Sequence, residues 1–142
     1  MSYDLLVFDP ATAPRERRAF LTWWDQQSEW TEDHGYDDPA VSTPGLRLWF
    51  LEIGAEFPPM NGPYAKEDFP DDEATLTDYS VGREAIYASF AWSKTELAYN
   101  TVFRLAEKHH LGFFDVSSED GAVWLPDPAG KLTKAHEGKS DS

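Results

Sequence analysis

The feature that most constrains the fold is an apolar stripe at helical spacing between residues 46 and 57. Its members recur at positions i, i+3, i+4, i+7 and i+11, which places them on one face of a helix: Leu46, Trp49, Phe50, Ile53 and Phe57. Thr43 followed by Pro44 is a helix start signal, and the two prolines at 58–59 end the pattern. Such a face is stable only against a second apolar layer.

Other segments alternate between strand and helix patterns. Residues 3–8 are apolar on both faces, which is typical of a short buried strand. Residues 93–96 read Ser-Lys-Thr-Glu, a capping-box pattern that predicts a helix running to about His109. In chain order the expected elements are strand 3–8, helices 14–29 and 43–57, strands 76–82 and 85–92, helix 93–109, and strands 112–117 and 122–125.

This order of elements predicts an α+β fold. We expect a two-layer sandwich in which the helices cover one face of a mixed or antiparallel sheet. The central part has the ferredoxin-like order β-α-β-β-α-β, with an extra helix and a C-terminal hairpin. We expect a single domain over residues 1–126 and a flexible polar tail over residues 127–142.

The chain is strongly acidic. Its 142 residues include 26 Asp and Glu against 12 Lys and Arg, which gives a formal net charge of −14. A protein of this charge repels the phosphates of nucleic acids and of anionic membranes, so we expect neither as a partner. It attracts basic proteins, and we expect a basic protein partner. Solubility alone also accounts for an acidic surface, and the sequence leaves both explanations open.

The composition excludes some kinds of chemistry and predicts where in the cell the protein is located. The chain has no cysteine, which excludes disulfides, thiol catalysis and cysteine-ligated metals. The first nine residues lack the basic start and the long apolar run of a signal peptide. No segment approaches the ~20 apolar residues of a membrane span. We therefore expect a cytoplasmic protein.

Two loops, at 29–38 and 67–73, concentrate the acidic residues. Aromatic residues stand within or beside them, and Trp and Tyr are enriched among the residues that dominate protein–protein binding. We expect the aromatic residues to anchor the partner and the carboxylates to speed association. The predicted partner-binding residues are Glu29, Trp30, Glu32, Asp33, Tyr36, Asp37, Asp38, Tyr64, Asp68, Asp71 and Asp72.

A metal or catalytic site is a weaker interpretation of the same residues. Asp25 and Glu29 lie four residues apart with His34 beyond them, but this pattern supplies one imidazole and lacks the His-Glu-x-x-His spacing. No Gly-x-Ser-x-Gly turn frames a serine, and no glycine-rich phosphate loop occurs. We assign no catalytic residue, and we expect no metal and no cofactor.

Three segments of the chain are distinctive in combination. They are residues 3–10, residues 57–63, which read Phe-Pro-Pro-Met-Asn-Gly-Pro, and the stretch from 78–82 through 113–118 to 123–126. Together they resemble a group of small stand-alone bacterial proteins of unassigned activity, over most of the chain up to about residue 126. The resemblance implies a partner among the toxins that bacteria secrete or deliver by contact, and thus an immunity-type protein. It implies no catalytic residue.

Two functions from different classes remain open. The first is an immunity-type binding module that occludes a basic toxin domain. The second is a small enzyme or small-ligand binder, with a pocket between helices and sheet near Asn61, Tyr64 and Asp115 and with the loop 58–75 as its cover. A homodimer is compatible with either, because the short apolar strand 122–125 is suited to pairing at a sheet edge.

Overall fold

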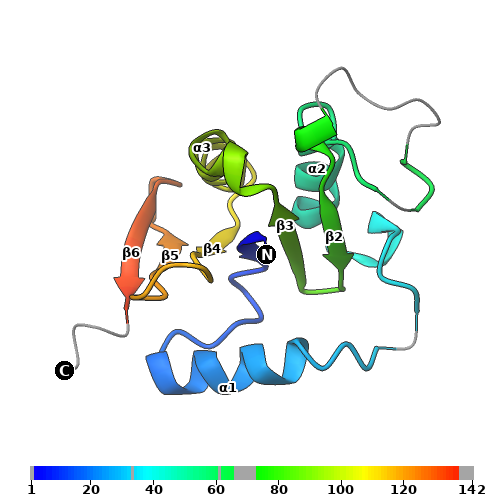
Figure 1. Cartoon of the computed structure of the whole chain (residues 1–142). Helices are drawn as coiled ribbons and strands as arrows, with labels where there is room; N and C mark the ends of the chain where they lie inside the picture. The colour runs from blue at the N-terminus through cyan, green and yellow to red at the C-terminus, as the bar shows by residue number, and fades with distance from the viewer. Residues whose placement is uncertain (1, 33, 61, 66–72, 138–142) are drawn as a thin grey trace.

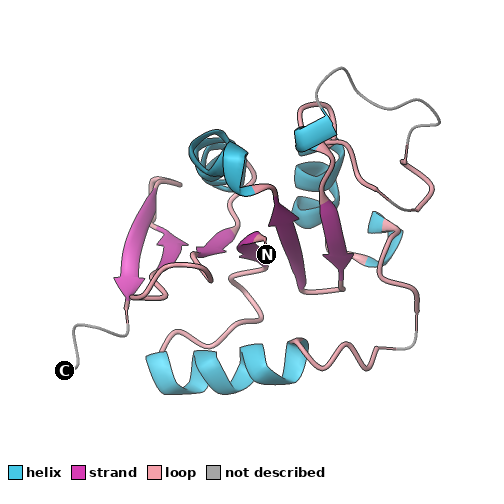
Figure 2. Cartoon of the chain, in the orientation of Figure 1, coloured by secondary structure: helices cyan, strands magenta, loops and turns pink. Residues whose placement is uncertain are grey.

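Three α-helices and a six-stranded sheet make up the computed structural model, which describes residues 2–32, 34–60, 62–65 and 73–137 (Figure 1). The strands, drawn in magenta in Figure 2, are β1 (Tyr3–Phe8), β2 (Asp78–Val81), β3 (Ala85–Phe90), β4 (Gly112–Phe114), β5 (Val123–Pro126) and β6 (Leu132–His136). The helices are α1 (Arg17–Gln27), α2 (Pro44–Ile53) and α3 (Thr95–Lys108), with short 3-10 turns η1 (Pro39–Val41), η2 (Glu73–Thr75) and η3 (Trp92–Lys94).

The sheet is open and antiparallel, with the strand order β2-β3-β1-β4-β5-β6. β1 lies near its centre, where Leu6 stands opposite Tyr87 of β3 and Phe114 of β4. The predicted α+β class is confirmed. The finer ferredoxin-like order is not shown.

Helices cover both faces of the sheet, which corrects the predicted two-layer arrangement (Figure 1). On one face Leu5 and Val7 of β1 join the core formed with α2 and α3. On the other face Leu6 and Phe8 join a second core, formed with Phe20 of α1. The reason lies in β1 itself. Its residues are buried on both faces, so each face needs a cover of its own.

The apolar stripe is buried as predicted. All five of its members are at most 1% exposed: Leu46, Trp49, Phe50, Ile53 and Phe57. α2 ends at Ile53, so Phe57 enters the core from the turn that follows the helix. The Tyr79 hydroxyl donates a hydrogen bond to the Phe57 carbonyl at 2.8 Å, which ties this turn to β2.

The helix starts differ from the sequence signals. The capping box predicted at 93–96 does not form, because α3 begins at Thr95 and no side-chain hydrogen bond caps its first turn. α1 has a cap that the sequence analysis did not identify. The Glu16 carboxylate accepts a hydrogen bond from the backbone N–H of Ala19 at 2.7 Å.

Residues 132–136 form β6, where we predicted a flexible tail. Asp127 closes the preceding turn, since its Oδ1 accepts hydrogen bonds from the backbone N–H groups of Ala129 and Lys131, both at 2.9 Å. Leu132 then buries its side chain in the core. β6 covers β5, so the expected edge position of residues 122–125 is also wrong. Residues 138–142 lie outside the described part of the chain.

Candidate partner-binding surface

The acidic loop 29–38 folds back onto the hairpin between β2 and β3. The backbone N–H of Val81 donates a hydrogen bond to the Tyr36 carbonyl at 2.8 Å. The Glu32 carboxylate accepts a hydrogen bond from the backbone N–H of Arg83 at 3.1 Å and also contacts the His34 imidazole. Glu32 is therefore half-buried and holds the loop in place, rather than presenting a free charge.

Carboxylates and cationic side chains tie elements together at two places. The hydrogen bond between His34 and the Gly35 carbonyl, followed by the Glu32 carboxylate, raises the pKa of His34. Between α3 and α2, Lys108 contacts Glu52 at 2.9 Å and lowers the pKa of that carboxyl. Both arrangements fix neighbouring segments of the fold.

Trp30 and Tyr36, two of the predicted anchors, lie in an intramolecular aromatic cluster. The Trp30 ring stands edge-on to Tyr36, with centroids 5.2 Å apart, and to Trp24 at 6.2 Å. Trp24 in turn stacks on Tyr87 of β3, with centroids 5.5 Å apart. Trp30 has a φ of +51°, a left-handed conformation that turns the chain out of α1 into the loop. Both predicted anchors are half-buried, so each offers a partner only part of its ring.

The other predicted carboxylates of this loop have different surroundings. Asp38 caps η1, because its side chain accepts a hydrogen bond from the backbone N–H of Ala40 at 2.9 Å. Glu29 and Asp37 are exposed, and their side chains form no hydrogen bond or ion pair with any described residue. Four predicted residues lie outside the described ranges: Asp33, Asp68, Asp71 and Asp72.

A close backbone contact brings Tyr64 next to this loop. A Cβ on Gly62 would stand 2.3 Å from the carbonyl oxygen of Asp37, and the φ of Gly62 is +90°, which L-residues rarely adopt. Gly62 therefore lies directly against Asp37 of loop 29–38. Tyr64 follows two residues later, is 48% exposed, and has its ring 6.0 Å from that of Phe50 in α2. Two predicted residues, Asp37 and Tyr64, thus border one contact between two loops.

Two exposed apolar side chains, Leu51 of α2 and Tyr64, border one hollow, and Leu51 is 43% exposed. We call Leu51 and Tyr64 the Tyr64 patch. The hollow has a volume of about 260 Å³ and is lined by Phe50, Leu51, Gly54, Ala55, Pro59 and Tyr64.

A second apolar periodicity in the sequence, on the other side of the helix, indicates this patch. Leu48 and Leu51 lie on the side of α2 opposite to the buried stripe, Ala55 continues their i, i+3, i+7 spacing just after the helix, and all three are exposed. A helix with apolar residues on both sides needs a cover for each side or leaves one for a partner.

The pocket predicted near Asn61, Tyr64 and Asp115 stays a prediction, and among the described residues only Tyr64 of the three lines a hollow that we describe. The hollow beside Tyr64 contains no part of Asp115, which follows β4 and lies beside Tyr3 and Tyr99. Asn61 is outside the described residues. Burial raises the pKa of Asp115, and its Oδ1 is buried with no hydrogen-bond partner in the described structure. Burial, followed by the Asp115 charge, also raises the pKa of Tyr3.

Replacing Asp115 with asparagine is expected to stabilise the protein at pH 7 but not at pH 3. The pKa of Asp115 is higher in the folded than in the unfolded protein, so its protonated form stabilises the fold. This stabilisation is fully present below the ordinary Asp pKa of about 3.9, and it is lost as the pH rises through the raised pKa. Asparagine does not ionise and avoids that loss. Urea denaturation of wild type and variant at both pH values measures the difference, and an equal difference at the two pH values would contradict the expectation.

The described residues contain no group of three His, Asp or Glu side chains that could hold a metal ion. Every helix in the described ranges is too short or too polar to cross a membrane. Comparison with protein-family models, with curated proteins and with solved structures finds no match to this chain.

Proposed function

We propose that this chain is a binding module for a basic protein, and that it acts as an immunity-type inhibitor by covering a toxin domain. The observation that carries the proposal is the Tyr64 patch, in which Leu51 and Tyr64 are exposed and line a hollow. The Asp37 carboxylate, which has no partner among the described residues, belongs to loop 29–38, whose backbone at Asp37 lies against Gly62. A matching partner offers an apolar side chain to the hollow and a cationic side chain to Asp37.

The apolar patch supplies the affinity of such a surface. A few aromatic anchors usually carry most of the binding energy, and tyrosine gives a large, rigid contact area. The hollow between the Tyr64 ring and Pro59 gives a partner side chain a place to be buried. At about 260 Å³ it is smaller than the roughly 300–1,000 Å³ of typical small-molecule pockets. Its size therefore favours a protein side chain over a free metabolite.

Charge supplies the selectivity. A net charge of −14 attracts basic proteins and repels acidic ones. On the side of α2 that faces α3 the carboxylates are already paired, Glu52 with Lys108 at 2.9 Å and Glu56 with Arg104 at 3.4 Å. Asp37 has no such partner among the described residues. We therefore expect the partner's cationic side chains to lie over loop 29–38.

A toxin domain that acts on nucleic acid suits this acidic cover. Such domains bind phosphates through Lys and Arg. An acidic protein competes for the same cationic surface by presenting carboxylates where phosphates would bind. This inhibition requires no catalytic group, in keeping with a sequence in which we find no catalytic motif. The proposal also follows the resemblance to small stand-alone bacterial proteins of unassigned activity, which implies a toxin as the partner.

Replacing Tyr64 with alanine is expected to weaken partner binding at least tenfold. Truncation of a central aromatic anchor costs about 2 kcal/mol or more, and about 1.4 kcal/mol corresponds to tenfold in affinity. The immobilised protein captures proteins from a lysate of its source organism, and calorimetry measures the affinity of the purified partner. Trp92 is the matched control, because it is also 48% exposed but belongs to η3, outside the patch. Trp92→Ala is expected to bind like wild type.

The identity and behaviour of the captured protein decide the proposal. Support requires a basic protein whose binding depends on Tyr64, is indifferent to Trp92, and weakens as salt rises from about 0.05 M to about 0.5 M. An acidic partner, or binding that salt and Tyr64→Ala leave unchanged, contradicts it. The immunity role has its own test. Expression of the partner should arrest growth, and co-expression of wild type, but not of Tyr64→Ala, should restore it.

A further inference from the structure

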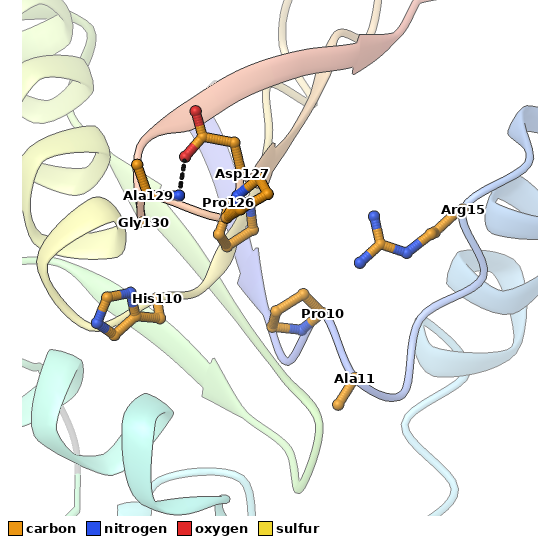
Figure 3. A pocket seen from close by; sticks show the side chains of 9 residues that line it. Pro10, Ala11, Arg15, His110, Pro126, Asp127, Ala129 and Gly130 are labelled. Carbon is orange, nitrogen blue, oxygen red and sulfur yellow. Dashed lines mark hydrogen bonds between the residues drawn. The ribbon is translucent and has the colours of Figure 1, made fainter.

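A second hollow lies away from the Tyr64 patch, where the chain leaves β1 and where β5 turns into β6. It has a volume of about 450 Å³ and contains the side chains of Arg15 and His110 (Figure 3). Pro10, Pro126 and Pro128 form apolar parts of its wall. The volume is within the roughly 300–1,000 Å³ typical of small-molecule sites.

The walls of this hollow are held by defined backbone geometry. His110 has a φ of +58°, so the turn between α3 and β4 adopts a left-handed conformation that is uncommon for a non-glycine residue. Gly130 has a φ of +87°, and a Cβ there would stand 3.0 Å from Cε1 of His110. The β5–β6 turn therefore packs closely against the imidazole. Three prolines with fixed φ angles limit the movement of the remaining wall.

The charged groups in the hollow favour an anion. Arg15 and His110 are exposed, and their side chains form no hydrogen bond or ion pair with the described residues. The carboxylate of Asp127 also borders the hollow, and its Oδ1 is oriented by hydrogen bonds from the backbone N–H groups of Ala129 and Lys131. In Figure 3 Arg15 and His110 lie on opposite sides of Pro10, and the Asp127 carboxylate is turned toward Ala129. Among the described residues, the donors of Arg15 and His110 therefore remain available to a ligand in this hollow.

We propose that this hollow binds a small molecule that carries an oxyanion, a phosphate ester or a carboxylate, on a compact apolar body. The planar guanidinium of Arg15 suits both anions, because its paired N–H groups match two oxygens at once. The His110 imidazole supplies a further donor, and a cationic one when it is protonated. The proline wall accommodates the apolar body. This site is independent of the protein-binding surface.

Phenyl phosphate, benzoate and benzamide test the proposal on the isolated protein. The first two carry the two anions on the same ring, and benzamide is the neutral counterpart of benzoate. We expect at least one anion to shift the backbone amide signals of Ala129 and Gly130 saturably in NMR spectra, with a Kd of about 1 mM, as suits a ligand of about ten non-hydrogen atoms. Benzamide is expected to leave them unchanged. Binding of phenyl phosphate alone identifies a phosphate ester, and binding of benzoate alone identifies a carboxylate.

Two variants and a control assign the binding to this hollow. Arg15→Gln should weaken binding at least fivefold, and His110→Asn should weaken it while keeping the left-handed turn, which Asn tolerates. Arg18→Gln is the matched control, because Arg18 is also exposed but borders another hollow, on α1. The proposal is overturned if neither anion binds, if benzamide binds as well as the anions, or if Arg15→Gln behaves like Arg18→Gln. None of these outcomes tests the proposed binding of a protein partner at the Tyr64 patch.

Discussion

Replacing Phe20 with alanine is expected to lower the free energy of unfolding by about 3–5 kcal/mol. Phe20 is fully buried on α1, and its ring centroid lies 5.2 Å from those of both Phe8 and Phe114 on the sheet. Its removal loses the contacts of the ring and leaves a cavity between the helix and the sheet. Domains are stable by only about 5–15 kcal/mol, so the variant loses a large share of its stability.

Thr22→Ala is the matched control in the same helix. The Thr22 side chain is exposed and alanine has a high helix propensity, so the change should stay within about 0.5 kcal/mol. Urea denaturation of the two variants and wild type gives both values. A Phe20→Ala cost as small as that of Thr22→Ala would mean that α1 is not packed as a third layer.

Elements that depend on neighbouring residues were predictable. β1 spans Tyr3–Phe8, as the apolar run indicates, and every member of the 46–57 stripe is buried. Strand and helix periods of 2 and 3.6 residues are visible in any short window of sequence. The same run in β1 also contained the reason for a third layer, since a strand that is apolar on both faces needs a helix on each.

Elements that depend on distant residues were not predictable. In β6 only Leu132 is buried, so the strand shows no alternation, and its pairing with β5 depends on the turn that Asp127 closes. The position of α1 depends on which face of the sheet α2 and α3 leave open. Neither property is visible in a local pattern.

The candidate surface also has features that a local sequence pattern predicts and features that depend on distant residues. A tryptophan in an acidic loop is a plausible anchor in the sequence, but Trp24 and Tyr87 reach Trp30 from other elements and enclose it in part. Tyr64 has fewer ring neighbours, with Phe50 beneath it, and stays exposed. Its neighbour Leu51 was missed because α2 was interpreted only through its buried face.

Replacing Gly62 with alanine is expected to reduce partner binding at least tenfold, as strongly as Tyr64→Ala. A Cβ at this position would stand 2.3 Å from the carbonyl oxygen and 2.9 Å from the Cβ of Asp37, so the loop backbone has to move. The φ of +90° adds about 1–2 kcal/mol of strain for an L-residue. We expect segment 58–65 to separate from loop 29–38, which moves Tyr64 away from Asp37. The free energy of unfolding should fall by roughly 1–3 kcal/mol.

Gly35→Ala separates this effect from a general response to glycine replacement. Gly35 lies in loop 29–38, has no left-handed φ, and a Cβ there would meet nothing nearer than Oδ1 of Asp37 at 3.6 Å. Alanine at such a compatible position stabilises by about 0.4–1 kcal/mol at most, through the unfolded chain. Denaturation and partner titration are measured on both variants. If Gly62→Ala retains wild-type affinity, the partner does not need the two loops in contact, and Asp37 and Tyr64 do not act as one surface.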